Sequence, residues 1–114
     1  MIDVFYRGTC EGLGRNRVEV VRNGVAQPLV HHVLHSPVGF TWGYDGSGPH
    51  ELARCILIDY LDLKDESIFS SLPSNYHDFV RDHIATLPPH GTPCTWVISG
   101  STIAAWLKEH ASEK

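Results

Sequence analysis

The stretch GFTWGYDGSGPHELA, residues 39–53, contains the residues whose types and spacing best suit ligand chemistry. The backbone amides of Gly46, Ser47 and Gly48 precede a predicted helix, where successive N–H groups and the helix dipole favour an anion such as phosphate. Arg54, one turn into that helix, would add a positive charge. A P-loop lysine and the third glycine of a dinucleotide-binding fingerprint are missing. The same glycines also fit a tight turn that only joins two elements, and we expect this structural role.

Three aromatic residues alternate with small ones just before this turn. Phe40, Trp42 and Tyr44 would share one face of a strand, with Thr41 and Gly43 on the other face. Such a stripe can stack nucleic-acid bases, each base contributing about 1–3 kcal/mol. It can also be the sheet's contribution to the hydrophobic core, packed against the helix that follows. We expect core packing, and a ligand at this corner would use Trp42 and Tyr44.

Histidines form a second candidate cluster. His31 and His35 are spaced i and i+4, so on a helix they would share one face, as the zinc ligands of an HExxH motif do. The general-base glutamate of that motif is replaced by His32, and Pro28 and Pro37 leave room for two helical turns at most. We therefore expect a polar loop here, with no metal and no cofactor.

A small enzyme is a further alternative, because catalytic side chains meet in space rather than in sequence. It would need a deep pocket in which two or more of Cys10, His31, His50 and Asp45 converge. The sequence contains no nucleophile elbow, paired-carboxylate signature or CxxC pair that would support it. We therefore expect a protein that is not an enzyme.

Composition limits the partners. Nine basic and thirteen acidic residues give a net charge of −4. Non-specific binding of nucleic acid normally requires an excess of basic residues, so we do not expect it here. The chain shows no signal-peptide pattern and no run of eighteen apolar residues, which predicts a cytoplasmic protein without a membrane partner. Its 114 residues predict one globular domain, 1–114.

The elements that position these residues follow from hydrophobic periodicity and turn signals. Asn23-Gly24 predicts a tight hairpin, because a type I′ turn needs two residues with positive φ. The order β-β-β-β-α-α-β-α predicts an α+β fold: a small, mainly antiparallel sheet with helices packed on one face. The predicted strands are 2–6, 17–21, 25–30, 39–44 and 93–99, and the predicted helices are 49–62, 74–87 and 102–110.

The helix predicted for residues 49–62 has an unusually wide apolar surface. Its polar arc contains Glu51 and Arg54, but Cys55 and Ile58 lie on the same arc. A second element or another subunit should therefore cover that side, and self-association of the chain is one way to do so.

The run SPVGFTWGYDGSGPHELARCILIDYL resembles the core signature of a family of short bacterial and phage-borne proteins of unknown function. Members typically read GFEWGYGGSGPAQLALAILADYLGD, so this chain departs from the pattern at Thr41 and Asp45. The resemblance implies a shared fold and a mobile-element context, but no activity. Further matches are Tyr6 to Gly8, Asn23-Gly24, Leu87-Pro88, Trp96 to Ser99, and Ile103 to Leu107.

From these features we expect a non-enzymatic binding protein of a phage, plasmid or prophage. Its partner would be a host or element-encoded protein, with the chain acting as an inhibitor or modulator of a host defence or regulatory complex. Aromatic and arginine side chains, which protein interfaces use as anchors, motivate this hypothesis. The alternatives are a phosphate- or nucleotide-binding domain that uses the corner at residues 43–51, and the small enzyme described above.

Overall fold

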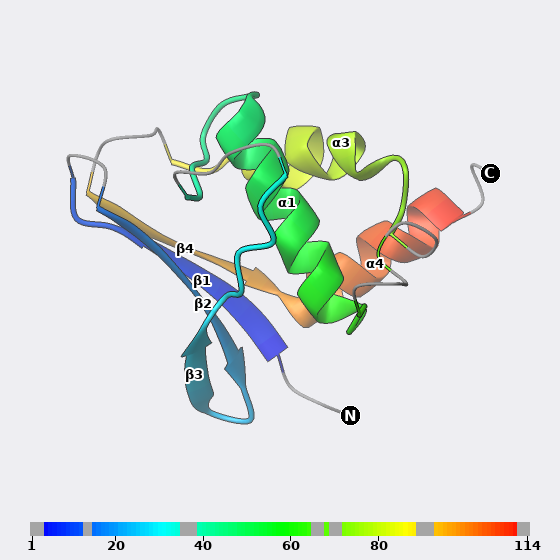
Figure 1. Ribbon diagram of the computed structural model, residues 1–114, viewed down its shortest axis with the longest axis horizontal. Helices are drawn as coiled ribbons and strands as arrows, with labels where there is room; N and C mark the ends of the chain where they lie inside the picture. Colours follow the sequence, from blue (N-terminus) through cyan, green and yellow to red (C-terminus); the bar gives the residue numbers. More distant parts are fainter. Residues whose placement is uncertain are drawn as a thin grey trace.

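A computed structural model describes residues 4–12, 15–34, 39–64, 68, 72–88 and 93–111. The fold is α+β, as predicted: one antiparallel sheet carries the helices on a single face (Figure 1). The spatial order of the strands is β3-β2-β1-β4, and the elements follow one another along the chain as predicted, apart from residues 39–44. The strands are β1 (Val4–Cys10), β2 (Asn16–Arg22), β3 (Val25–Pro28) and β4 (Cys94–Ser99), and the helical segments are α1 (Ser47–Tyr60), α3 (Tyr76–Phe79), the π-helix η1 (Val80–Ile84) and α4 (Gly100–Ala111).

The β2–β3 hairpin forms at the predicted turn. Asn23 and Gly24 have φ values of 51° and 81°, the left-handed backbone that a two-residue type I′ turn requires. Arg22 pairs with Val25 directly beside the turn. Pro28 ends the edge strand β3, where the N–H that proline lacks is not needed by another strand.

The two faces of the sheet differ in burial because side chains alternate along each strand. On β1, Tyr6 and Cys10 are buried beneath the helices, while Arg7 points to the open face and pairs with Glu19 of β2. Gly8 lies opposite Trp96 in the β1–β4 register, and a Cβ at Gly8 would overlap the indole ring. The Trp96 ring lies against the backbone of β1 at Gly8, and this contact therefore requires glycine at position 8.

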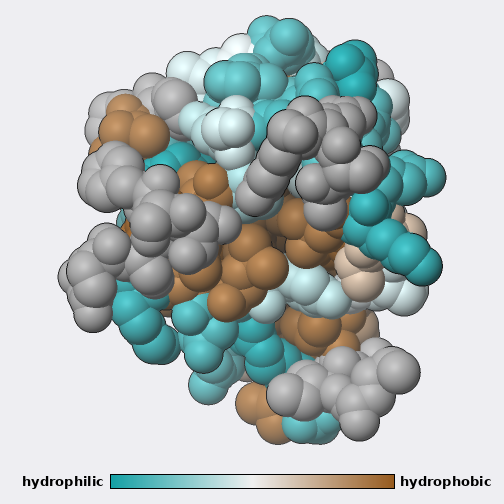
Figure 2. All heavy atoms as spheres, turned by 90° about the vertical axis from the view of Figure 1, so that its right-hand side faces the viewer, coloured by the Kyte–Doolittle hydropathy of each residue, from teal (hydrophilic) through white to brown (hydrophobic). Residues whose placement is uncertain are grey.

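The hydrophobic core lies between this buried face of the sheet and α1. Leu52, Ile56 and Leu57 are fully buried along α1, and Phe79 packs edge-to-face against Trp106 of α4. Figure 2 shows apolar atoms gathered in the middle of the side on which α4 lies, with hydrophilic residues above and below them. No helix within the described part of the chain has the length and apolar character needed to cross a membrane.

The strand predicted for residues 39–44 is wrong. These residues form irregular chain that does not pair with the sheet. Gly39 and Gly43 have φ values of 120° and 84°, which interrupt extended backbone at both ends of the segment. The segment is held instead by side-chain and loop contacts: Asn16 Nδ2 donates to Phe40 O, and Gly43 N donates to Ile84 O at 3.0 Å.

The helix predicted for residues 74–87 begins at Tyr76 and changes its winding. After one α-helical turn in α3, η1 adopts the wider π-helical form, in which Ala85 N donates to Val80 O at 2.7 Å. The carbonyl of Ile84, at the end of η1, accepts the hydrogen bond from Gly43. The end of η1 therefore anchors the irregular segment that precedes α1.

Candidate functional site

The corner at residues 43–51 joins irregular chain to α1 through closely packed glycines. Gly46 is the N-cap and has extended backbone, and His50 N donates to Gly46 O at 3.0 Å in the first turn. A Cβ at Gly48 would overlap the side chain of Thr41, and one at Gly46 would come within 2.6 Å of the Tyr44 ring. Both glycines therefore allow close packing of the corner, a structural role that differs from the tight turn expected from the sequence. Ser47 is the first residue of α1, two positions earlier than predicted, and is exposed.

The residues predicted to serve a ligand here lie in different environments. Trp42 is 1% exposed and packs edge-to-face on Trp96, with ring centroids 5.3 Å apart, so it belongs to the core. Tyr44 is 42% exposed, and its hydroxyl lies 2.9 Å from Thr41 Oγ1. Arg54, expected to provide the positive charge, is buried and its Nη1 donates to His32 O at 2.6 Å.

Glu51 is fully buried, although the helical pattern placed it on the solvated arc of α1. Its Oε2 atom accepts two hydrogen bonds from one segment: from His31 Nε2 at 2.9 Å and from the backbone N–H of Leu34 at 2.9 Å. A carboxylate without partners would be very costly to bury. The fold therefore uses Glu51 as the attachment point for the chain that follows β3.

We call residues 29–34 the strap. Its beginning is fixed where Leu29, itself buried, donates its N–H to Val18 O at 3.0 Å. Its middle is fixed at His32, whose carbonyl accepts from Arg54 and whose N–H lies 3.3 Å from Cys55 Sγ. Burial raises the pKa of the Cys55 thiol to about 11, which keeps this side chain protonated and unreactive.

The strap is the second element that the wide apolar surface of α1 requires. It covers Cys55, and Ile58 lines a hollow beside the strap. Both residues are buried within the chain. A second subunit is therefore not needed to cover them, and the signal that suggested self-association has an intramolecular cause.

The outer side of the strap is apolar and open to solvent. Val30, Val33 and Leu34 are 61%, 59% and 56% exposed. Isolated exposed apolar side chains are common, but three within five residues on a segment with buried attachments are a distinct feature. We call these three residues the apolar strip.

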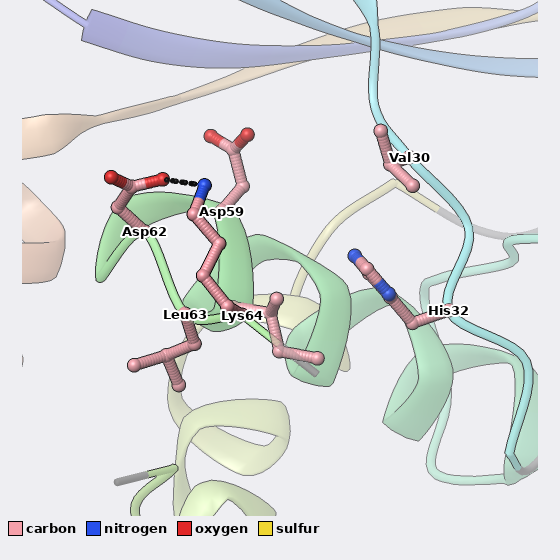
Figure 3. Close-up of a pocket in the computed structure, with 7 residues that line it drawn as sticks. Val30, His32, Asp59, Asp62, Leu63 and Lys64 are labelled. Atoms are coloured by element: carbon pink, nitrogen blue, oxygen red, sulfur yellow. Dashed lines mark hydrogen bonds and ion pairs between the residues drawn. The ribbon is translucent and has the colours of Figure 1, made fainter. Parts of the chain in front are cut away.

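A hollow of about 370 Å³ lies between the strap and the C-terminal end of α1. Figure 3 shows Val30 and His32 approaching from the strap, opposite side chains from the end of α1 and the residues after it. Its apolar lining is Val30, Ile58 and Leu63, and its polar lining is His32, Asp59, Asp62 and Lys64.

The charges of the hollow are largely balanced. Asp59 accepts hydrogen bonds from the Tyr6 hydroxyl at 2.6 Å and from the guanidinium of Arg22. Burial, with the bond to Asp59, raises the pKa of Tyr6 far above its ordinary value, so its hydroxyl remains a donor. Lys64 Nζ lies 3.1 Å from Asp62 Oδ1 on the exposed rim. The hollow thus combines an apolar centre with a polar rim of both signs.

The structure brings together only some of the residues considered for a metal or a catalytic site. His31 binds Glu51, and His35 lies outside the described residues. In the part of the chain that the structure describes, no three histidine, cysteine or acidic side chains gather as metal ligands would. Of the residues suggested for an enzyme, Asp45 and His50 contact each other at 2.7 Å, whereas Cys10 Sγ is 3.4 Å from Gly12 N.

The roles of Glu51 and the strap were missed from the sequence. One signal was present: two charged residues interleaved with Cys55 and Ile58 on a single arc of the helix. Charged side chains on an arc that is otherwise covered must be buried with partners. That arrangement predicts that the segment covering the arc is held by hydrogen bonds to the two charged side chains.

No curated protein and no solved structure matches the chain. A family model, described as a family of unknown function (DUF6166), matches residues 6–109 and so spans nearly the whole chain, including every residue of the strap and the hollow. The chain belongs to the DUF6166 family.

Proposed function

We propose that this chain is a non-enzymatic binding protein that docks a protein partner on the strap surface, which consists of the apolar strip and the hollow beside it. One observation carries the proposal. Two charged side chains, Glu51 and Arg54, are buried, and both bind the strap, whose apolar strip faces water. Burying charges costs free energy that apolar residues at the same positions would avoid. Holding an apolar segment in one conformation lowers the entropy lost when a partner binds.

The composition of the strap surface suits a protein partner. Interfaces typically have an apolar centre and a polar rim, and here Val30 and Ile58 are framed by Asp62 and Lys64. The hollow is near the lower end of the range of about 300–1,000 Å³ for small-molecule pockets. It suits one apolar side chain of a partner, inserted between the strap and the end of α1, with the apolar strip extending the contact.

The biological setting is part of the proposal. The chain would be encoded on a phage, plasmid or prophage and act in the cytoplasm, where it would inhibit or modulate a host defence or regulatory complex. The resemblance of residues 36–61 to proteins of mobile elements motivates this setting.

The phosphate-binding alternative has less support. Gly46 and Gly48 are closely packed by Tyr44 and Thr41, and Arg54 is committed to the strap. Thermal-shift measurements with inorganic phosphate and nucleotides at millimolar concentration test this alternative, since a ligand that binds only the folded state raises the melting temperature.

Site-specific photocrosslinking tests the docking proposal. A photoreactive benzophenone residue at Val33 should give one discrete adduct with another protein in bacterial cells that express the chain. The same residue at Thr95, exposed on the open face of the sheet, should give none.

Two matched variants make the test specific. Val30 and Val97 are exposed to similar extents, 61% and 57%, but Val97 lies on β4, away from the strap. Val30→Asp should abolish the adduct from position 33, and Val97→Asp should leave it unchanged. Equal adducts from positions 33 and 95 would contradict the proposal. An adduct of two copies of the chain would show that the strap surface binds a second copy of the chain and not a host protein.

A further inference from the structure

Two histidines from different helices meet beside the corner, away from the strap surface. His50 Nδ1 of α1 and His77 Nδ1 of α3 are 2.9 Å apart, and the other ring nitrogen of His50, Nε2, is 2.7 Å from Asp45 Oδ1. Figure 1 shows α3 beside the N-terminal half of α1. Neither the family match nor the strap surface accounts for this row of three side chains.

The carboxylate of Asp45 determines the tautomer of His50. A carboxylate only accepts hydrogen bonds, so His50 Nε2 carries the proton that is donated to Asp45. In the neutral ring, Nδ1 of His50 then has a lone pair that faces His77. Histidine ligands of metals typically show this arrangement, with one nitrogen on the metal and the other donating to a carboxylate.

The distance between the two Nδ1 atoms favours a particular metal geometry. At a metal–nitrogen distance of about 2.0–2.1 Å, two ligands at 90° lie about 2.9 Å apart, whereas tetrahedral ligands lie roughly 3.3 Å apart. The observed separation of 2.9 Å is that of a hydrogen bond between the two rings in the absence of metal, and it equals the ligand separation of the 90° arrangement, so a metal could replace the shared proton with little movement of the rings. Square-planar and octahedral sites of Cu²⁺ and Ni²⁺ have this angle, while structural zinc sites are tetrahedral.

The surroundings hold both rings in place before a metal arrives. The His77 ring stacks on Tyr76, with centroids 4.7 Å apart and planes inclined by 26°. The His50 side chain is only 20% exposed, and its ring also makes an edge contact with Tyr76 at 6.3 Å. Preorganised ligands lose little conformational entropy on binding.

We propose that His50 and His77 form a binding site for a divalent transition metal of the Ni²⁺ or Cu²⁺ type, with Asp45 orienting His50 and water completing the coordination. The metal bonds to Nδ1 of each ring, and the His77 proton moves from Nδ1 to Nε2. Both rings are neutral in the metal-bound state. If both rings are neutral before the metal binds, no proton is released, and if one ring is protonated, one proton is released. Because the ligands belong to α1 and α3, the metal also clips these helices together.

Isothermal titration calorimetry of the untagged protein with Ni²⁺ tests the site, since Ni²⁺ avoids the thiol oxidation that Cu²⁺ would cause. We expect one Ni²⁺ per chain and a higher melting temperature with Ni²⁺ present. His77→Gln should abolish both effects, and Asp45→Asn should weaken binding by about 10-fold, the scale of second-sphere losses. His83→Gln on η1 is the matched control and should bind as the wild type does.

Two outcomes would overturn the site. One is the absence of saturable binding to the wild-type chain, and the other is binding that survives His77→Gln. If such surviving binding were lost in His31→Gln, the metal would belong at the histidines of residues 31–35 instead. His77 is exposed and its substitution should not impair folding, which a melting curve without metal checks.

Discussion

Substitution of Glu51 by leucine removes the acceptor that holds the strap while keeping a side chain of similar size. Two donors lose their partner: the His31 ring N–H and the Leu34 backbone N–H, both 2.9 Å from Oε2 in the wild type. Both donors are partly buried, so each one left without an acceptor costs about 1–2 kcal/mol, the lower part of the range for buried donors. We therefore expect Glu51→Leu to lower the free energy of unfolding by about 2–4 kcal/mol, a large part of the typical total of about 5–15 kcal/mol.

Glu51→Gln separates the hydrogen bonds from the charge. A glutamine can place its carbonyl oxygen where Oε2 lies, and so keep both bonds at the strength of a neutral acceptor. The expected loss is about 1–2 kcal/mol. Urea unfolding of the three proteins, monitored by tryptophan fluorescence, gives these differences from the shift of the midpoint at constant slope.

Glu19→Leu is the control for this series. Glu19 is a half-buried glutamate on the open face of the sheet, where its carboxylate pairs with Arg7 at 3.1 Å. Partly exposed pairs of this kind contribute about 0–1 kcal/mol. If Glu51→Leu cost no more than Glu19→Leu, the reasoning that the strap is attached through a buried carboxylate would be refuted.

Three further substitutions probe other parts of the fold. Gly8→Ala should destabilise the protein by about 1–3 kcal/mol, because the added methyl group displaces the Trp96 ring, and thermal unfolding measures the loss. Gly48→Ala should cost a similar amount through its clash with Thr41, and a variant that unfolds at the wild-type temperature would contradict the packing of the corner. Burial raises the pKa of Cys55 from 9.0 to about 11, so its contribution to stability is present below pH 9 and is lost as the pH rises towards 11. The difference in stability between the wild type and Cys55→Ala should shrink over this range, as measured by urea unfolding at each pH.

The regular parts of the fold could be predicted because local rules agree with the tertiary structure there. Asn23-Gly24 supplies the positive φ values of the hairpin turn, and the alternating valines of residues 17–21 supply the buried face of β2. The family could also be recognised from the run around Trp42, and the match over residues 6–109 confirms it.

The irregular parts could not be predicted because no periodic signal specifies them. The alternation of Phe40, Trp42 and Tyr44 has the period of a strand, but Gly39 and Gly43 adopt positive φ and keep the segment out of the sheet. The strap has no period at all, since its position is set by hydrogen bonds to Glu51 and Arg54, which come about twenty residues later. Contacts of this kind are visible only once α1 and the strap lie side by side.

Amide hydrogen exchange of the strap, followed residue by residue by NMR, is the most direct test of whether this segment is a fixed surface. The backbone N–H groups of His32 and Leu34 should exchange many times more slowly than those of unstructured chain, since they donate to Cys55 Sγ and Glu51 Oε2. In Glu51→Leu the protection of Leu34 should disappear while that of the β1–β2 ladder persists. Exchange of both strap amides at the rate of unstructured chain in the wild type would show that the segment is not held in place, and would remove the basis for a preformed docking surface.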